Sequence, residues 1–323
     1  MSTDTEMDGV GDADARVDVS VVLAAFNAEA FIERAFRSAL DQAGVAVELI
    51  VVDDASTDGT VAKVRSLAGG DERVRVVALP ANGGPSVARN AAVEVARGEW
   101  IAVLDADDAM LPGRLQRLVE VGRSQGADIV ADVFLPFHAA TGETGEPTLR
   151  LGPAEVLDLP RYVQGARPFN AEADFGLLKP LFRRAFLARA GLRYPTEVRH
   201  GEDFELVFRC LQAGARFVLH REPFYLYTMR SSGFSRTRID YGGLIERSMQ
   251  LRDSLDPTGD ALARELMLER CRALERLEFQ HRYKQIRSAD GRARSLAFAL
   301  TQKEGWRAIM RKLAGGLRER SVA

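Results

Sequence analysis

The sequence predicts an α/β fold, in which a doubly wound, mostly parallel sheet is followed by a helical C-terminal extension. Short apolar runs alternate with amphipathic helical patterns from residue 17 to residue 135, and this alternation places strands in parallel with helices between them. Beyond residue 241 the apolar residues recur at helical spacing. The chain has 323 residues, of which 46% are hydrophobic, so it is long enough for one large α/β domain or two linked ones.

Four apolar runs in the first third of the chain are predicted to be buried strands. They cover residues 17–25, 47–52, 74–79 and 100–104. An amphipathic helical pattern follows each of the first three. We expect Ser56 or Thr57 to cap the second helix and Pro85 to lie in the first turn of the third. Polar clusters follow strands one, two and four, and ligands bind at this edge of such sheets.

The rest of the chain is less regular. We predict a helix over 112–124, a strand over 127–134, a loop over 136–153, and short strands over 216–219 and 224–229. A long helical pattern follows, with one apolar face formed by Ala263, Met267, Cys271, Leu274 and Leu277. A last helical segment around Trp306 carries an apolar stripe flanked by Arg and Lys residues.

Missing motifs narrow the range of functions. The chain lacks a Walker A sequence, a Gly-x-Gly-x-x-Gly after a strand, a Gly-x-Ser-x-Gly and a His-Glu-x-x-His. This argues against P-loop ATPases, Rossmann dehydrogenases, serine hydrolases and zinc peptidases. The two cysteines lie far apart and the four histidines do not cluster, so neither a disulfide framework nor a zinc site is expected. Basic residues without interleaved aromatic residues argue against nucleic acid as a partner.

Charge is unevenly distributed, although the whole chain has a net charge of −2. Residues 1–18 contain six acids and one arginine, which predicts a disordered acidic tail over 1–16. From residue 241 onward there are 17 Lys/Arg and 11 Asp/Glu, which favours an anionic surface as a partner. No apolar stretch approaches the roughly 18 residues of a membrane span, and the N-terminus does not resemble a signal peptide. We therefore expect a cytoplasmic protein.

Three acids follow the fourth predicted strand within four positions: Asp105, Asp107 and Asp108. Packing does not explain them, because adjacent buried carboxylates repel each other and resist ionisation. A hard divalent cation among them would relieve this repulsion, since Mg²⁺ or Mn²⁺ takes oxygen ligands and usually bridges phosphates. The segment therefore predicts a metal–diphosphate site. The alternative is an acidic surface turn that caps the next helix.

Several linked motifs resemble the successive signatures of glycosyltransferase family 2. They are 19–27 (VSVVLAAFN), 51–60 (VVDDASTDGT), 82–90 (NGGPSVARN), 104–108 (LDADD) and 201–206 (GEDFEL). Two further segments, 178–181 (LKPL) and 230–235 (RSSGFS), are similar to parts of bacterial exopolysaccharide enzymes of the succinoglycan type. Residues 241–323 carry no such resemblance.

The resemblance implies a GT-A fold and the transfer of a sugar, with inversion, from a nucleotide-sugar donor. It implies Asp107 as the ligand of Mg²⁺ or Mn²⁺, Asp105 as a contact of the ribose or the metal, and Asp108 as an assisting acid. The metal would act as a Lewis acid on the β-phosphate, where negative charge develops when the nucleotide leaves. UDP-glucose is the donor that the exopolysaccharide likeness implies.

The same resemblance assigns a nucleotide pocket. Ala25, Phe26 and Asn27 would line it at the end of the first strand, and Phe26 stands where the family often has tyrosine. Asp54 would accept a hydrogen bond from the nucleobase. Arg89 would steady the nucleotide, although a structural ion pair on a helix surface is the alternative.

An inverting transfer also needs a base for the acceptor hydroxyl. Asp203 matches the base position of the family, and Glu202 would adjust it through like-charge proximity. The alternative is a helix N-terminus whose acids face the helix dipole. Lys179 and Arg230 are weaker candidates for phosphate or acceptor contacts.

These assignments divide the chain into the tail at 1–16, a nucleotide-sugar-binding half at 17–135, an acceptor-binding half at 136–240 and a helical extension at 241–323. The expected acceptor is a polyprenyl-linked oligosaccharide or another glycan. The basic segment around Trp306 would then lie on the inner face of the plasma membrane, while packing against the rest of the protein is the alternative.

Two other functions stay open at this stage. Asp105-x-Asp107 after a strand is similar to the motif of haloacid-dehalogenase phosphatases, which want Thr or Val where this chain has Ala109. Asp53-Asp54 is similar to a receiver domain, which would make the protein a non-catalytic binding module, but its expected lysine partner lies too far along the chain.

Overall fold

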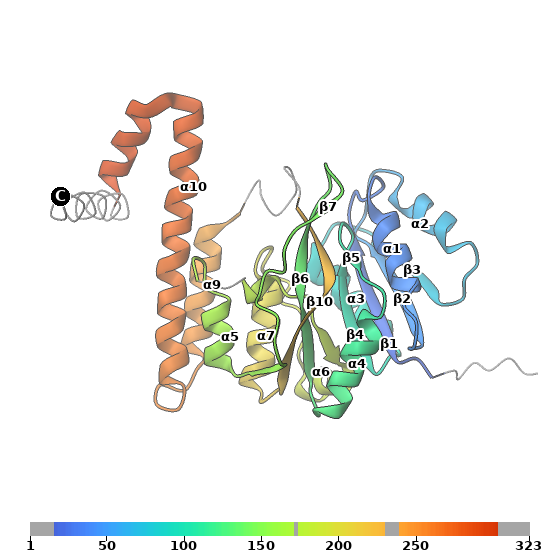
Figure 1. Cartoon of the computed structure of the whole chain (residues 1–323). Helices are drawn as coiled ribbons and strands as arrows, with labels where there is room; N and C mark the ends of the chain where they lie inside the picture. Colours follow the sequence, from blue (N-terminus) through green and yellow to red (C-terminus); the bar gives the residue numbers. More distant parts are fainter. Residues whose placement is uncertain (1–15, 171–173, 230–238, 303–323) are drawn as a thin grey trace, which may run out of the picture.

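The protein is described from a computed structural model, which covers residues 16–170, 174–229 and 239–302. Ten strands of this part form one sheet. They are β1 (Val19–Ala25), β2 (Val47–Asp53), β3 (Val74–Ala78), β4 (Trp100–Asp105), β5 (Ala109–Met110), β6 (Ile129–His138), β7 (Glu143–Thr144), β8 (Glu155–Leu157), β9 (Leu181–Arg183) and β10 (Phe217–Met229). Their order is β3-β2-β1-β4-β9-β6-β10-β5, with β7 beside β6 and β8 beside β10 (Figure 1).

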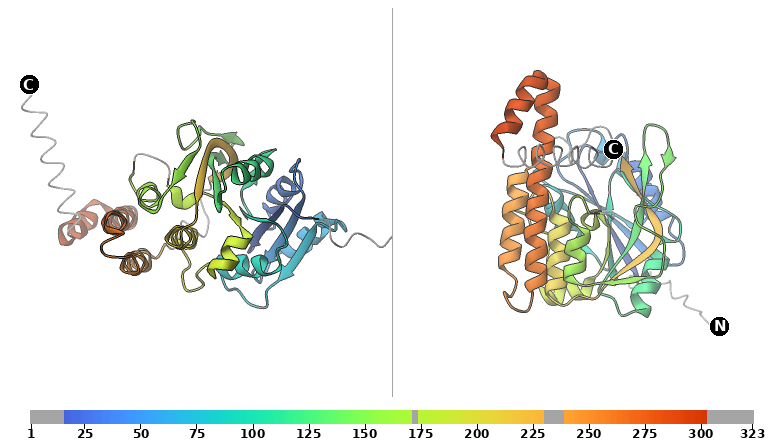
Figure 2. Two further views of the ribbon diagram at one scale, coloured as in Figure 1. Left: turned by 90° about the horizontal axis from the view of Figure 1, so that it is seen from below. Right: turned by 60° about the vertical axis from the view of Figure 1, so that its left-hand side comes forward.

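Helices lie on both faces of this sheet (Figure 2). They are α1 (Ile32–Leu40), α2 (Thr60–Ala68), α3 (Pro85–Val95), α4 (Arg114–Ser124), α5 (Leu159–Gly165), the 3-10 turn η1 (Phe175–Leu177), α6 (Arg184–Ala190), α7 (Glu202–Gln212), α9 (Tyr241–Asp253) and α10 (Ala261–Thr301). The arrangement confirms the predicted α/β fold with a doubly wound sheet and a helical C-terminal region.

The first four strands follow the sequence prediction closely. β1 pairs in parallel with β2 and with β4, which places Ala25 opposite Asp53 and Ala24 opposite Asp105. Both faces of β1, β2 and β4 are covered, and β2 is buried along its whole length, including Glu48 within its otherwise apolar run. Pro85 begins α3, as expected. The carboxyl ends of β1, β2 and β4 therefore meet at one edge of the sheet.

The second half of the sheet differs from the prediction in two places. β6 continues to His138 and pairs with β7, inside the segment expected to be a loop. The two short strands predicted after residue 216 form a single strand, β10, whose pairing with β6 shifts on either side of Pro223. Proline has no backbone N–H to donate, and such shifts accommodate it within a strand. β9 runs antiparallel between β4 and β6, so the sheet is mixed. Its long pairings, β1 with β2, β1 with β4, β2 with β3 and β6 with β10, are parallel, whereas the antiparallel pairings are short.

The caps proposed for α2 are also wrong. The helix begins only at Thr60, and Ser56 and Thr57 lie in the preceding turn, where they bond Asn27. The Asp58 carboxylate accepts from the backbone N–H of Thr60 instead, at 3.0 Å. The turn therefore uses its hydroxyl groups to join two strand ends.

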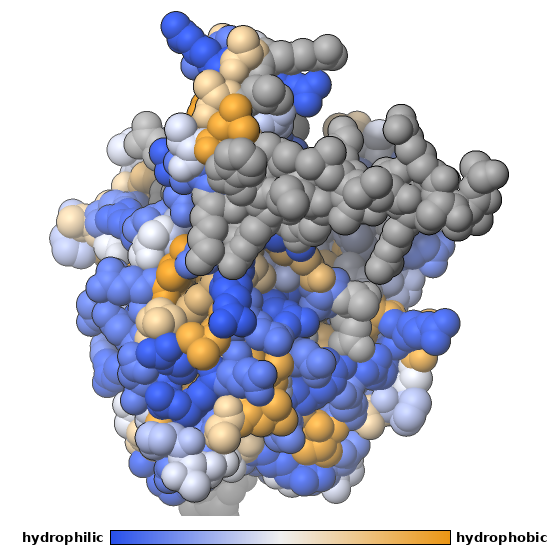
Figure 3. All heavy atoms as spheres, turned by 90° about the vertical axis from the view of Figure 1, so that its left-hand side faces the viewer, coloured by the Kyte–Doolittle hydropathy of each residue, from blue (hydrophilic) through white to orange (hydrophobic). Residues whose placement is uncertain are grey.

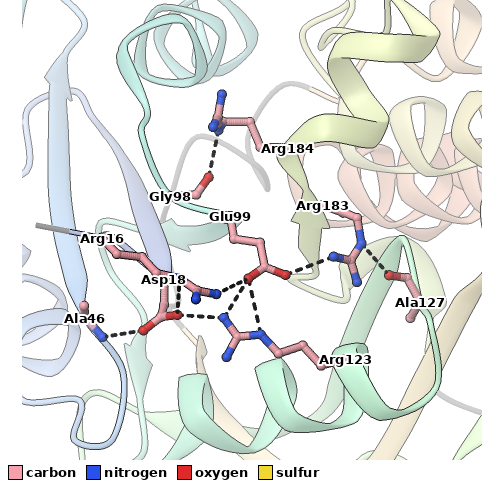
Figure 4. Close-up of polar contacts among 9 residues, drawn as sticks. All are labelled: Arg16, Asp18, Ala46, Gly98, Glu99, Arg123, Ala127, Arg183 and Arg184. Atoms are coloured by element: carbon pink, nitrogen blue, oxygen red, sulfur yellow. Dashed lines mark hydrogen bonds and ion pairs between the residues drawn. The ribbon is translucent and has the colours of Figure 1, made fainter. Parts of the chain in front are cut away.

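An ion cluster lies beside the first residue of β4, at the edge of the sheet opposite those carboxyl ends (Figure 4). The Glu99 carboxylate accepts from Arg123 at 2.6 Å, from Arg183 at 2.9 Å and from Arg16 at 3.3 Å. Arg123 also contacts Asp18 at 2.6 Å. The cluster therefore joins the start of β1, the start of β4, β9 and α4.

The C-terminal helices stand at the far side of the molecule from β1–β3 (Figures 1 and 2). α10 packs against α9 and α5, and four of the five residues predicted on its apolar face are buried: Ala263, Met267, Cys271 and Leu274. No helix in the described part of the chain is both long and apolar enough to cross a membrane. The tail at 1–15 and the segment around Trp306 lie outside the described residues. The predicted border at residue 135 falls within β6, and the division into halves stays a prediction.

Candidate active site

The ends of β1 and β2 are connected by their polar turns. The backbone N–H of Asn27 donates to the Ser56 hydroxyl at 2.9 Å, and the Asn27 side-chain oxygen accepts from the Thr57 N–H at 2.9 Å. Asn27 and Ala55 have φ values of 48° and 60°, which residues with a side chain rarely adopt. Such strain concentrates at functional sites, where the surrounding structure holds it. Phe26, beside this turn, is 45% exposed.

Asp54 fixes the turn before α3 to the same edge of the sheet, at the carboxyl ends of β1 and β2. Its two carboxylate oxygens accept from the backbone N–H groups of Gly83 and Gly84, each at 2.8 Å. The side chain is buried, so these two bonds replace its hydration. Asp54 thus connects the end of β2 to the turn before α3. Its predicted contact with a nucleobase stays a prediction.

Arg89 of α3 reaches three carboxylates from two other elements, β4 and α7. Its guanidinium contacts Asp105 at 2.7 Å, Glu202 at 2.9 Å and Asp203 at 3.1 Å. The side chain is 5% exposed, and the Tyr194 ring lies 5.2 Å from its guanidinium carbon. Arg89 is therefore a buried hub between β4 and the first residues of α7.

Lys179, just before β9, is the second buried cation of this cluster. Its ammonium group contacts Asp203 at 2.7 Å and Asp105 at 2.8 Å, and its side chain is 6% exposed. Burial raises the pKa of Asp105, but Lys179 and Arg89 outweigh it and hold the pKa well below its ordinary value. Two cations therefore keep Asp105 charged and join it to Asp203.

Asp108 is held in a different way. Its carboxylate accepts from the Tyr225 hydroxyl at 2.7 Å and from the Thr228 N–H at 2.8 Å, and the residue is 2% exposed. Burial and the charges of Asp105 and Asp107 raise its pKa to about 7. The Tyr225 hydroxyl also accepts from the Asp105 N–H at 3.3 Å. Asp108 therefore fixes the acidic loop to β10.

Comparison with known proteins identifies the family. Residues 20–188 match the model of glycosyl transferase family 2, which is more than half of the chain. The chain belongs to this family.

Two curated relatives of the glycosyltransferase come from Rhizobium meliloti. The succinoglycan biosynthesis protein ExoO is 40% identical over 69% of this chain and 64% of its own length. The succinoglycan biosynthesis protein ExoU is 35% identical over 92% of this chain and 87% of its own length. The match to ExoO therefore spans just under two thirds of that protein, whereas the match to ExoU extends far into the C-terminal helices.

Solved structures share the fold of the glycosyltransferase. The crystal structure of S. aureus TarS 1-349 in complex with UDP-GlcNAc aligns with a TM-score of 0.65 and 21% identity, over 79% of this chain and 72% of that one. The likeness confirms the GT-A fold expected from the sequence motifs.

The glycosyltransferase also contains a site residue that sequence reasoning missed, Arg34 of α1. Its guanidinium donates to the backbone carbonyl of Asp107 at 2.6 Å and to the Thr228 hydroxyl, and it lies 4.1 Å from the centre of the Phe137 ring. Arg34 thereby holds the acidic loop against β10 and β6. An arginine within an amphipathic helix carries no sequence signal for this role.

A buried ion pair behind the site was missed as well. Arg114 and Asp132 are fully buried and 2.7 Å apart. Arg114 also donates to the Lys179 carbonyl at 2.5 Å, and its guanidinium carbon lies 4.8 Å from the Tyr225 ring. The pair therefore fixes the backbone of Lys179 and the ring that supports Asp108. The sequence does place the charged residue Arg114 next to Leu115 on an apolar helix face, which could have indicated a buried ion pair.

The acids after β4 have the chemistry of a site for a hard cation. Asp105 is paired with Arg89 and Lys179, and Asp108 accepts two hydrogen bonds, so neither carboxylate is placed as a dedicated ligand. No group of three His, Cys, Asp or Glu side chains in the described residues is arranged to hold a metal. Mg²⁺ commonly uses one or two carboxylates and completes its shell with substrate phosphates. The metal site expected at Asp107 therefore stays a prediction.

The C-terminal helices contact α7 directly. Glu205 is 1% exposed and accepts from Arg247 of α9 through both oxygens, each at 2.6 Å. The Arg270 guanidinium of α10 lies 3.9 Å from the centre of the Phe204 ring, next to Asp203. α7 is thus held by the extension as well as by the sheet. Arg230, the remaining candidate from the sequence, lies outside the described residues.

Proposed function

We propose that this glycosyltransferase transfers a sugar, with inversion, from a nucleoside diphosphate donor to a glycan or lipid-linked saccharide. The observation that carries the proposal is the joining of Asp105 and Asp203 through Arg89 and Lys179. This cluster brings the proposed donor residue and the proposed base into one site. The UDP-GlcNAc bound in the S. aureus TarS structure supports a nucleotide sugar as the donor class.

The donor nucleotide would lie across the ends of β1 and β2. Phe26 is an exposed aromatic surface for the base, with Ala25 and Asn27 beside it, and Asp54 would accept from the base ring. Asp105 would contact the ribose or the metal. Asp107 would hold Mg²⁺ or Mn²⁺ against the diphosphate, with Asp108 assisting, and the cation would offset the charge of the leaving nucleotide.

Asp203 would act as the base. Its carboxylate takes the proton of the acceptor hydroxyl as the new bond forms at the sugar's anomeric carbon, on the face opposite the leaving diphosphate. Arg89 and Lys179 are close enough to Asp105 to contact the diphosphate as its charge grows. Glu202 shares Arg89 with Asp203. Arg230 lies outside the described residues, and its phosphate or acceptor contact stays a prediction.

The relatives ExoO and ExoU support a role in exopolysaccharide synthesis, because both carry succinoglycan biosynthesis in their names. A polyprenyl-linked acceptor would bring the enzyme to the inner face of the plasma membrane. The segment around Trp306 would make that contact. Vesicle binding that is unchanged by truncation before Lys303 would contradict this part of the proposal.

A thermal-shift panel tests the donor site. We expect a uridine nucleotide such as UDP or UDP-glucose to stabilise the protein more with Mn²⁺ or Mg²⁺ than without. A ligand at 100 times its Kd adds about 2.7 kcal/mol to the free energy of unfolding. Asp107→Asn should remove the metal-dependent part, whereas Asp41→Asn on the surface should not.

Two activity assays separate the proposal from the two other functions. A phosphatase would hydrolyse p-nitrophenyl phosphate, and a receiver domain would be phosphorylated by acetyl phosphate; we expect neither reaction. The family match runs through both the Asp53-Asp54 and the Asp105–Asp108 motifs, and no comparison supports either alternative. Failure of every nucleoside diphosphate to stabilise the protein would overturn the proposed function.

A further inference from the structure

The first half of α10 is packed against other helices, whereas its second half projects from the fold. Its first half is packed against α9 and α5, with buried residues at helical spacing up to Leu274. Residues 282–301, here called the arm, rise beyond the rest of the fold and turn back at Gly291, whose φ of 83° interrupts the helix (Figure 1). The Phe279 and Phe298 rings stack 5.8 Å apart and join the two segments. The arm is therefore a folded projection rather than a frayed helix end.

The charge of α10 changes at the same point. Residues 261–281 contain four arginines and four glutamates, so the packed half is neutral. The arm has five basic residues and one acid, Asp290, which gives a net charge of +4. The basic residues are Arg282, Lys284, Arg287, Arg292 and Arg294. Because the whole chain has a net charge of −2, all other residues together carry −6.

The described basic side chains of the arm face solvent. The side chains of Arg282 and Arg294 are 58% and 75% exposed, although each lies near one acid, Glu278 or Asp290. Lys284 and Arg287 are exposed as well. Leu300 is 44% exposed among them, and Figure 3 shows hydrophilic side chains beside hydrophobic ones on this projection. The arm thus combines a cationic surface with an apolar contact.

We propose that the arm is a docking surface for an anionic lipid bilayer. Clusters of four or more Lys and Arg on a helix bind anionic headgroups, and their long side chains place charge at the headgroups while apolar atoms lie deeper. An acidic body is repelled by such a surface, so the projection of the positive charge away from it sets the orientation of docking. The Phe298 ring is stacked on Phe279, so this ring face is already occupied and is not offered to a nucleic acid base. The proposal does not depend on the donor or on the reaction.

Co-sedimentation of the full chain with vesicles tests this surface. We expect binding to phosphatidylcholine vesicles with 30% phosphatidylglycerol, little binding to pure phosphatidylcholine, and weaker binding as salt rises. Each basic residue near an anionic surface contributes about fivefold, the equivalent of about 1 kcal/mol. The variant Arg282→Gln, Lys284→Gln, Arg287→Gln, Arg294→Gln should lose at least about tenfold in the vesicle partition coefficient.

A matched control removes four exposed arginines from the body of the protein: Arg65, Arg75, Arg150 and Arg193, each to Gln. It should retain the binding of the unmodified chain. Equal binding by the arm variant and the control would overturn the proposal, as would absence of binding by the unmodified chain. Tighter binding of the arm to duplex DNA than to the anionic vesicles at the same salt would replace the lipid with nucleic acid and also overturn it.

Discussion

The two ends of β4 both carry carboxylates paired with basic side chains, yet they are built for different purposes. At the N-terminal end, one acid, Glu99, is shared by three arginines (Figure 4). At the C-terminal end, the two buried cations Arg89 and Lys179 serve three acids, with two more acids close by in sequence. The first end has more cations than acids, and the second has more acids than cations.

This difference separates a structural cluster from the cluster proposed to be functional. The arginines around Glu99 reach solvent with their outer parts, so the cluster joins elements without burying an uncompensated charge. The cluster at Asp105 buries its cations and leaves an excess of negative charge at the edge where such sheets bind ligands. Like charges held close together reduce the stability of the folded protein, and active sites commonly carry such a cost. The four predictions below test that contrast.

The largest effect is expected for Asp203→Asn. The amide cannot accept the acceptor proton, so transfer should fall by about 100-fold to 10,000-fold. Donor binding, followed by thermal shift with UDP and Mn²⁺, should persist because Asp105 and Asp107 are unchanged. Asp41→Asn serves as the control for loss of a surface carboxylate. Transfer by the variant at the unmodified rate would remove Asp203 from the mechanism.

Lys179→Met should reduce stability as well as activity. It removes the ammonium shared by Asp105 and Asp203 and leaves two carboxylates close together with Arg89 alone. Loss of one partner of a buried ion pair costs about 3 kcal/mol. Urea denaturation measures the loss, and Lys63→Met, at a more exposed lysine, should cost far less. An unchanged midpoint for Lys179→Met would show that the cluster is not buried as described.

Glu99→Gln should affect stability only. Burial would raise the pKa of Glu99, but Arg123, Arg183 and Arg16 outweigh it and lower the pKa below the ordinary value of 4.5. A lowered pKa in the folded state gives stability that is present above pH 4.5 and is lost as the pH falls through the folded pKa. We expect a loss of about 1 kcal/mol at pH 7 that shrinks as the pH falls below about 4. Donor binding should not change.

The smallest of the four effects is expected from salt, which should weaken the ion pairs at one end of β4 more than those at the other. At 1 M salt the Debye length is about 3 Å, so partly exposed pairs are screened while buried pairs are screened much less. The destabilisation by Glu99→Gln should therefore shrink between 0.1 and 1 M NaCl by a few tenths of a kcal/mol, in the range of exposed pairs. The destabilisation by Lys179→Met should persist. The opposite ranking would reverse the roles assigned to the two clusters.

The first four strands were predictable from the sequence because their runs are mostly apolar, with Glu48 and Arg75 as the charged exceptions, and polar clusters follow strands one, two and four. The strand β10 was not, since Arg221, Glu222 and Pro223 interrupt the apolar pattern within it. The shift in pairing that accommodates the proline depends on β6, a distant segment. Local pattern therefore identifies strands covered on both faces better than strands with an irregular partner.

The candidate site also combines features that the local sequence indicates with features that depend on distant segments. The motif resemblance indicated Asp105, Asp107 and Asp203 one by one. The sequence does not indicate which basic side chains connect Asp105 with Asp203. Arg89 and Lys179 meet Asp105 from positions 16 and 74 residues away in the chain, and only the packing of α3 and β9 around β4 brings them together. Arg34 was missed for the same reason. Its partner is a backbone carbonyl, which every residue has.

The contact between Glu205 and Arg247 bears on how members of this family can be recombined. A chimera that exchanges the acceptor half at residue 240 would separate the buried Glu205 from Arg247, one of the two arginines that contact it. It would also leave the Phe204 ring without Arg270. An exchange that moves α7, α9 and the packed half of α10 as one block keeps both contacts. These helices therefore form one packed assembly that crosses the boundary predicted at residue 240.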